Sequence, residues 1–199
     1  MVSAPVLAVP GSIGPQGIPE FSARGRDTQL RAIGVSGTST AHGPALRLSG
    51  DHSRITVENL HMPEDRATLC VWLKPEKRGE FYVLSDQYLG FYIRLRGEVI
   101  WAAFYRDVIA GTQRVLKIGE WNHLAVRFGE TVDIFLDGRL IRSVITSKAD
   151  YKSDCHKRTM HLFGDQFGRF AIPGLVRDLR VYNRLLSPEE IANLARKGK

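Results

Sequence analysis

The hydrophobic positions of this chain alternate with polar or small residues, with a period of two. Leu124, Val126 and Phe128 form one such run, and a second run follows it directly. This period is typical of β-strands that bury one face. The second run ends at Asp137-Gly138, a pair that supplies the positive φ angles of a type I′ turn. The pattern therefore predicts two paired strands followed by a tight hairpin turn.

Similar short runs, separated by turn residues, continue from about residue 45 to residue 182. The predicted strands lie near 45–49, 53–58, 66–74, 80–85, 90–96, 98–105, 109–116, 121–128, 131–137, 139–146, 159–163 and 174–182. Phe21 to Thr40 is expected to add one edge strand and some loop. Many short strands at such spacing predict an all-β sandwich.

One helix is predicted, at the end of the chain. Ser187 is the expected N-cap, Pro188 occupies the first helical position, and Glu190 completes a capping box. The apolar residues that follow recur at helical spacing. We expect this short helix to pack at the edge of the sandwich.

The first 25 residues form a separate Gly/Pro-rich leader in this interpretation, and residues 26–199 form the sandwich domain. Residues 11–19 contain three Gly-X-Y triplets, the spacing that collagen requires. Two explanations stay open: a linker without fixed structure, or the end of a collagen-like stalk that would make the assembly a homotrimer. The start lacks the basic residues of a secretory signal, and no apolar run approaches the ~20 residues that cross a bilayer. A soluble protein is expected.

Four separated segments resemble one known family, the laminin-G-like, concanavalin A-like jelly rolls. They are Gly43–Gly50 with the strand at 55–57, Ala67–Pro75, the hairpin that begins at Gly119, and Gly174–Ile191. The resemblance implies a jelly-roll β-sandwich of two antiparallel sheets with a short C-terminal helix. It also implies recognition of sugars or proteins, with catalysis in only some members.

The chain departs from this family at positions that matter for a metal ion. Ser53 and Arg177 stand where relatives often carry acidic residues, and an arginine is unsuited to bind calcium. Pentraxins pair a cysteine like Cys70 with one at the position of Ala125, so that branch does not fit. No resident cofactor or metal is expected. A rim calcium ion bound by Asp51, Asp86 or Asp165 and main-chain carbonyls remains an alternative.

Composition sets wide bounds on function. The chain has 199 residues, 43% of them hydrophobic, which suffices for one substantial core. A net charge of +7 favours anionic partners, although such a charge is also ordinary for a soluble domain. The two cysteines, Cys70 and Cys155, exclude a disulfide scaffold and a four-thiolate zinc site, and their pairing stays open.

Catalytic motifs do not emerge from the sequence. Glycosidases of the resembled superfamily carry Glu-x-Asp-x-x-Glu on one strand, and this chain has no such run. The nearest candidates, Glu130 and Asp133, are spaced to point to opposite faces of a strand. His123 belongs to the hairpin and is expected to be structural, whereas His161 is a better isolated candidate without a partner motif. A non-catalytic module is therefore favoured.

Two surfaces are candidates for ligand binding. Aromatic and arginine side chains share faces of adjacent strands turning at Arg96-Gly97 or Gly97-Glu98, and a basic loop spans residues 148–158. Aromatic faces stack on sugar rings and arginine binds carboxylate or sulfate. Core packing and solvation are the competing explanations for these residues. The predicted ligand-binding residues are Tyr92, Arg94, Trp101, Tyr105, Arg106, Lys152, Lys157 and Arg158.

The sequence thus favours a lectin-like recognition and adhesion module that binds a glycan, including an anionic one, or an extracellular protein. Two alternatives remain: a polysaccharide lyase or hydrolase of the same fold, and the structural or receptor-binding head of a trimeric virion or surface fibre. Nucleic acid is a weak third partner because no RNA-binding motif is present. The expected location is extracellular, cell-surface or virion-associated.

Overall fold

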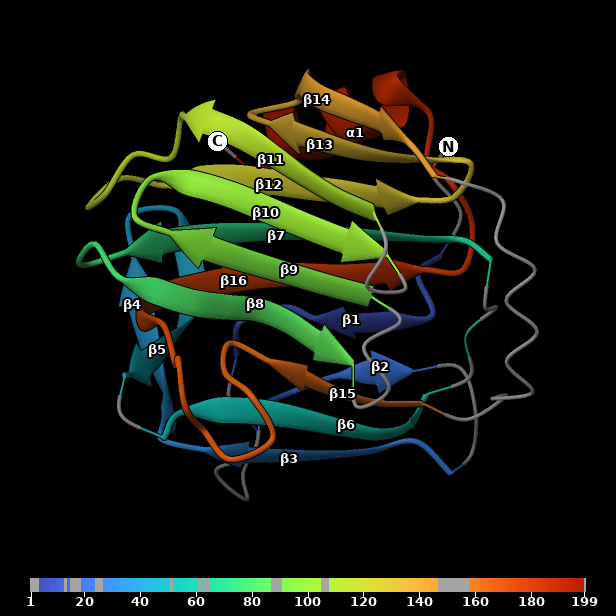
Figure 1. Ribbon diagram of the computed structural model, residues 1–199. Coiled ribbons are helices and arrows are strands. Elements are labelled where there is room, and N and C mark those ends of the chain that lie inside the picture. The colour runs from blue at the N-terminus through green and yellow to red at the C-terminus, as the bar shows by residue number, and fades with distance from the viewer. Residues whose placement is uncertain are drawn as a thin grey trace.

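The computed structural model describes residues 4–12, 14, 19–23, 27–50, 52–60, 62, 65–86, 91–104, 108–146 and 158–198, with only the backbone of residues 108, 109 and 158. Two antiparallel sheets lie face to face, and Figure 1 views them with the seven-stranded sheet in front. The jelly-roll β-sandwich predicted from the sequence is confirmed.

The rear sheet has nine strands in the described residues. Its main path runs β14 (Arg139–Ile145), β13 (Thr131–Leu136), β12 (Asn122–Phe128), β7 (Ala67–Pro75), β16 (Pro173–Tyr182), β1 (Leu7–Val9) and β2 (Ser22–Ala23). Two further strands join it through β16, namely β5 (Gly43–Ser49) and β4 (Val35–Thr40).

The front sheet has seven strands in the part of the chain that is described. In spatial order they are β11 (Val108–Arg114), β10 (Val99–Phe104), β9 (Phe91–Arg96), β8 (Glu80–Asp86), β15 (Arg158–Leu162), β6 (Arg54–Leu60) and β3 (Gln29–Ile33). Every strand expected from residue 45 onward is present, and each end lies within two residues of its predicted position. The segment from Phe21 to Thr40 contains β2, β3 and β4, two strands more than the one expected.

The core lies between the two sheets and is built from alternate residues of each strand. Leu69 and Val71 of β7 are at most 1% exposed and face inward. Phe91 of the front sheet stacks on Phe104 with ring centroids 5.3 Å apart, and it lies 5.1 Å from Phe128 of the rear sheet. These aromatic contacts join the two layers and explain two of the aromatic positions as core packing.

Part of the expected leader is a strand of the sandwich. β1 pairs with the second half of β16 from Leu7↔Val181 to Val9↔Leu179, and Leu7 is fully buried. The first half of β16 pairs instead with β5. A bulge between Arg177 and Arg180 separates the halves, and β1 covers the edge that β5 leaves open. The triplets at residues 11–19 lie largely outside the described residues, and the domain boundary at residue 25 stays a prediction.

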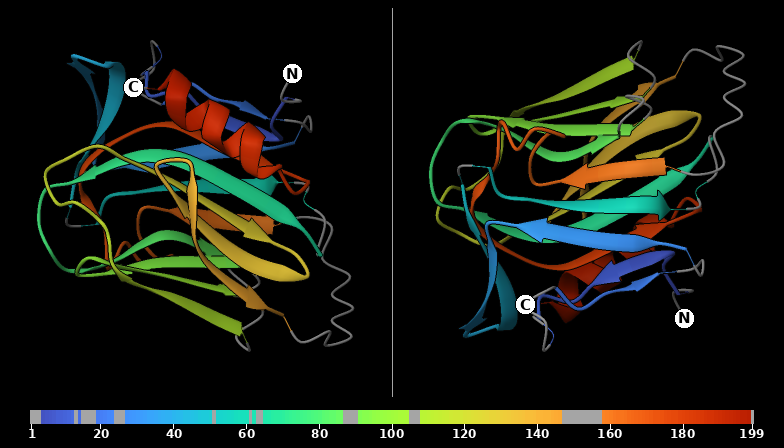
Figure 2. Two further views of the ribbon diagram at one scale, coloured as in Figure 1. Left: turned by 90° about the horizontal axis from the view of Figure 1, so that it is seen from above. Right: turned by 90° about the horizontal axis from the view of Figure 1, so that it is seen from below.

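The predicted helix is present as α1 (Pro188–Lys197), with its capping box formed by Ser187 and Glu190. Its position differs from the expectation, because it covers the outer face of the rear sheet rather than an edge (Figure 2). Ile191 packs there with outward-facing residues of the four strands β13, β12, β7 and β16, among them Cys70 and Phe135. These apolar side chains on the outer face give the helix its binding surface.

The hairpin turn between β13 and β14 has the predicted geometry. Asp137 and Gly138 have φ angles of 50° and 82°, as a type I′ turn requires. A Cβ atom on Gly138 would lie 3.0 Å from Ala192 of α1, so the helix also presses on this turn. Glycine is thus needed for both its backbone angle and its small size.

Candidate functional site

The outer face of the front sheet brings together three of the predicted ligand-binding residues. Tyr92 and Arg94 alternate on β9, and Trp101 of β10 lies opposite Arg94 in the pairing register. The strands turn at Gly97-Glu98, the second of the two expected turns, and Gly97 has a φ of 62°. Together with Arg96, these side chains line a shallow hollow of about 160 Å³.

Two neighbours on β8 were missed by sequence reasoning. Tyr82 lies opposite Arg94, and its ring is 5.4 Å from the ring of Tyr92. The guanidinium carbon of Arg94 lies 5.9 Å from the centroid of Tyr82. Glu80 forms an ion pair with Arg94 and a longer one, 3.9 Å, with Arg96. The hollow therefore has two arginines facing one carboxylate.

The indole of Trp101 lies against the backbone of β11. A Cβ atom on Gly111 would be 3.2 Å from the Trp101 ring, so a larger residue there would push the ring outward by a few tenths of an ångström. Trp101 is partly exposed, whereas the core aromatic residues of the same strands are buried. One ring face is thus held on a flat backbone surface beside the two arginines.

The tyrosine hydroxyls of this face stay protonated at neutral pH. Burial, with the neighbouring Tyr82, raises the pKa of Tyr92 to about 12, and burial also raises the pKa of Tyr82. Tyr92 receives a weak hydrogen bond of 3.4 Å from Nη1 of Arg94. A catalytic base must be unprotonated at the working pH, and these raised pKa values leave little tyrosinate for that role.

His161 shares the face but not the hollow. It lies opposite Ser85 of β8, which lies opposite Tyr92, so the three residues form a row across the sheet. His161 is 7% exposed, and its Nδ1 is 3.2 Å from the hydroxyl of Thr56. Burial lowers the pKa of His161. The row places a histidine and a tyrosine two strands apart without a direct contact among the described interactions.

The described part of the chain does not place the other predicted ligand-binding residues at this hollow. Tyr105, Arg106, Lys152 and Lys157 lie outside the described residues. Arg158 starts β15, where its backbone pairs with Leu60. The basic loop therefore stays a prediction.

The two candidate carboxylates of the hairpin do not form a catalytic pair. Asp133 is 3% exposed and accepts hydrogen bonds from Arg127, Thr131 and Ser143. Glu130 is exposed in the turn before β13. The carboxylate of Asp133 is therefore occupied by structural donors.

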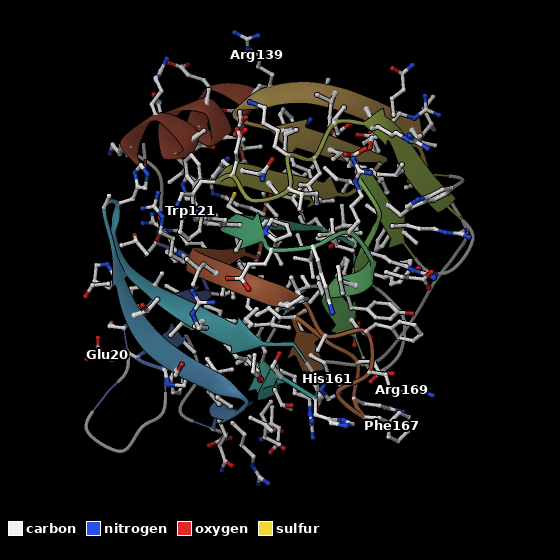
Figure 3. All side chains as sticks on the ribbon, turned by 90° about the vertical axis from the view of Figure 1, so that its left-hand side faces the viewer. Glu20, Trp121, Arg139, His161, Phe167 and Arg169 are labelled. Atoms are coloured by element: carbon white, nitrogen blue, oxygen red, sulfur yellow. The ribbon has the colours of Figure 1, made fainter. Side chains whose placement is uncertain are left out.

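His123 is buried on β12, with its ring 5.2 Å from that of Trp72. Burial lowers its pKa to about 4, so it is neutral at pH 7. Arg177 lies between two indoles, 5.1 Å from Trp72 and 4.9 Å from Trp121, and donates to the carbonyls of His42 and Gly198. Trp121 is labelled in Figure 3. Arg177 thus ties the end of α1 to the rear sheet, a role that explains an arginine where a calcium ligand would be acidic.

The aspartates proposed for a rim calcium ion are only partly described. Among the described residues, no group of three or more His, Cys, Asp or Glu side chains could hold a metal ion. Asp51 lies outside that part of the chain. Asp86 is fully buried, and Asp165 accepts hydrogen bonds on both carboxylate oxygens. Cys70 has a free, buried thiol whose pKa is raised by burial, and Cys155 lies outside the described residues.

The fold and the hollow define a β-sandwich module with a polar, aromatic face. Its sequence matches a family model described as the concanavalin A-like lectin/glucanases superfamily over residues 49–192. The chain belongs to this laminin-G-like family. A comparison with curated proteins gave no match.

Solved structures confirm the fold. The binding domain of botulinum neurotoxin DC in complex with SialylT is 11% identical with a TM-score of 0.71, covering 98% of this chain and 52% of that one. The serotype D ligand binding domain in complex with N-acetylneuraminic acid is 13% identical with a TM-score of 0.65, covering 97% and 50%. The chain therefore spans about half the length of these neighbours. No helix among the described residues is long and apolar enough to span a membrane.

Proposed function

We propose that this chain is a non-catalytic recognition module that binds a glycan bearing a carboxylate or sulfate. The observation that carries the proposal is the hollow on the front sheet, where Trp101 lies beside Arg94 and Arg96. An indole face covers the apolar side of a sugar ring, and arginine donates paired hydrogen bonds to an acidic group. The two features are adjacent here.

The size of the hollow agrees with a short contact on a longer chain. Its volume of about 160 Å³ is small beside the roughly 300–1,000 Å³ of pockets that enclose a whole drug-sized ligand. A single sugar unit resting on the surface fits this dimension. We therefore expect weak binding per site, with neighbouring units contributing outside the hollow.

The structural neighbours support the ligand class. One is described in complex with N-acetylneuraminic acid, an acidic sugar, and another with SialylT. Because this chain matches only about half of each neighbour, the position of a glycan site is argued from the hollow of this chain alone. An extracellular, cell-surface or virion-associated setting fits such a ligand and belongs to the same proposal.

The test uses an arginine pair. Arg96→Ala removes an exposed arginine from the hollow, and Arg139→Ala removes an exposed arginine from β14, at the top of Figure 3. On an array of acidic and neutral glycans, we expect saturable binding to acidic chains. Arg96→Ala should weaken that binding about five-fold or more and flatten its salt dependence, while Arg139→Ala should not. Equal effects of the two variants would remove the hollow as the site.

Two rival functions are separated by other measurements. Release of shortened products from uronate polymers, lost in a variant lacking His161, would indicate a lyase using the row that contains Tyr92. A trimer in light scattering would support a fibre head with residues 11–19 as its stalk. Binding that depends on Lys152, Lys157 or Arg158 would place recognition on the basic loop.

A further inference from the structure

A loop at one end of the sandwich presents two exposed phenylalanines beside basic side chains. It joins β15 to β16 over residues 163–172. Phe167 is 59% exposed and Phe170 is 44% exposed. Figure 3 shows Phe167 and Arg169 together at the periphery of the molecule. Grouped apolar side chains held in solvent mark a contact surface.

The loop is held in shape by Asp165, which is 8% exposed. Its Oδ1 accepts the backbone N–H groups of Phe167 at 2.9 Å and Arg169 at 2.7 Å. Its Oδ2 accepts Nε of Arg169 at 2.8 Å. The guanidinium of Arg169 lies 4.8 Å from the Phe167 ring, and Phe170 packs edge-on against Tyr82. The phenyl rings are therefore positioned before any partner binds, which lowers the ordering cost of binding.

Basic side chains lie on one side of this loop. A hollow of about 260 Å³ beside the loop is lined by Lys77, Arg169 and His52, and no carboxylate lines it among the described residues. Arg54 lies next to the loop, since a Cβ atom on Gly168 would be 2.8 Å from its Nη1. Asp165, the acidic residue in the loop, is paired with Arg169. The local charge is therefore positive.

This combination selects among partners. Neutral sugars need hydrogen-bond acceptors as well as donors, whereas Lys77, Arg169 and Arg54 only donate. A free phosphate or sulfate would use the cations but leave the projecting rings in water. A surface that offers negative headgroups above apolar chains uses both features.

We propose that this end of the sandwich docks on an anionic lipid surface. Phe167 and Phe170 enter the boundary between headgroups and acyl chains, and Lys77, Arg54 and Arg169 contact the negative headgroups. This contact is separate from the glycan hollow and does not depend on the proposed function. The loop binds at the surface and does not span the bilayer.

Vesicle sedimentation tests the proposal. The full chain should sediment with vesicles of equimolar phosphatidylserine and phosphatidylcholine, but not with phosphatidylcholine alone, and added salt should weaken the binding. Phe167→Ala should reduce the affinity about ten-fold, because a buried phenyl ring is lost. Lys77→Ala should reduce it about five-fold. Circular dichroism checks that each variant is folded.

Three matched variants serve as controls. Phe21→Ala removes a phenyl that is 38% exposed. Its neighbour in sequence, Glu20, is labelled on the opposite side of Figure 3 from Phe167. Arg139→Ala removes an exposed charge, and Arg96→Ala alters the glycan hollow. All three should bind vesicles like the unchanged protein.

Several results would overturn the proposal. One is no sedimentation of the unchanged chain with phosphatidylserine vesicles. Another is a loss in Phe21→Ala as large as in Phe167→Ala. A third is full release by soluble phosphoserine with no effect of Phe167→Ala, which would reduce the contact to capture of a headgroup. Phe167-dependent binding to an acidic polysaccharide without vesicle binding would also replace the lipid surface with another partner.

Discussion

Replacing Asp133 by alanine gives a direct test of whether this buried carboxylate is structural. Its side chain is 4% exposed and accepts hydrogen bonds from Nε and Nη2 of Arg127 at 3.1 Å and 2.5 Å. The hydroxyls of Thr131 and Ser143 donate to it at 2.8 Å and 2.5 Å. Arg127 also donates to the carbonyl of Leu186, just before the N-cap of α1. The network thus connects the hairpin to the helix.

The expected loss of stability in Asp133→Ala follows from the charge of Arg127 that remains. Asp133→Ala leaves the guanidinium of Arg127, whose side chain is only 20% exposed, without its carboxylate. Removing one partner of a buried pair costs about 3–5 kcal/mol. For a domain of this size, the melting temperature should fall by about 6–20 °C. Arg127→Met combined with Asp133→Ala should restore part of this loss, because the uncompensated charge is removed.

Urea unfolding followed by circular dichroism measures the change. Glu130→Ala, in the exposed turn three residues earlier, is the matched control and should alter stability by no more than about 0.5 kcal/mol. Glycan binding by the folded fraction should be the same in both variants. A loss below about 1 kcal/mol in Asp133→Ala would refute the structural role. So would an equal loss in Glu130→Ala.

Three further outcomes concern stability. Leu7→Ala should lower the free energy of unfolding in urea by about 2–5 kcal/mol, because Leu7 is fully buried. Ile33→Ala, at a 50% exposed position, should lower it far less, and equal losses would place β1 outside the fold. Ser187→Ala should cost about 1 kcal/mol through loss of the helix cap, and an unchanged midpoint would refute this. The hydrogen-bonded ion pair with Arg184 lowers the pKa of Glu190 from 4.5 to about 2. The stabilisation by this pair is therefore complete above pH 4.5 and is lost as the pH falls towards 2. Glu190→Gln should flatten the dependence of the unfolding free energy on pH in this range, and an unchanged dependence would contradict the prediction.

The strands were predictable because their alternation is local. A strand such as β9 buries one face, which imposes a period of two on its own residues. The strands under α1 are buried on both faces, and there β-branched and aromatic residues between turn residues mark the strand instead. β1 was not predictable in this way. Its three residues stand between Pro5 and Pro10, and they are ordered because β5 leaves half of the edge of β16 unpaired. The unpaired edge of β16 arises from the tertiary structure, so the residues near the start of the chain show no sequence pattern that predicts β1.

The hollow shows the same division between local and distant information. Tyr92, Arg94 and Trp101 were found together because one short turn fixes the register of β9 and β10. Tyr82 and Glu80 were missed because sequence does not say which strand lies beside β9. A register shift between Tyr82 and Leu84 also breaks the alternation that would have revealed their face.

Asp165 illustrates why an acidic loop residue is ambiguous in sequence and decided by its donors. Flanked by Gly164 and Gly168, it resembles a candidate calcium ligand, yet Phe167 N, Arg169 N and Arg169 Nε already occupy its oxygens. A calcium ion there competes with three charge-assisted hydrogen bonds, one of them from the cationic guanidinium of Arg169. We therefore expect added calcium to leave the melting temperature unchanged, whereas a tightly bound ion would raise it with concentration. A calcium-dependent rise in the melting temperature that disappears in Asp165→Asn would show that the loop opens to bind the ion. The assumption of a rigid loop, on which the lipid-docking proposal depends, would then be wrong.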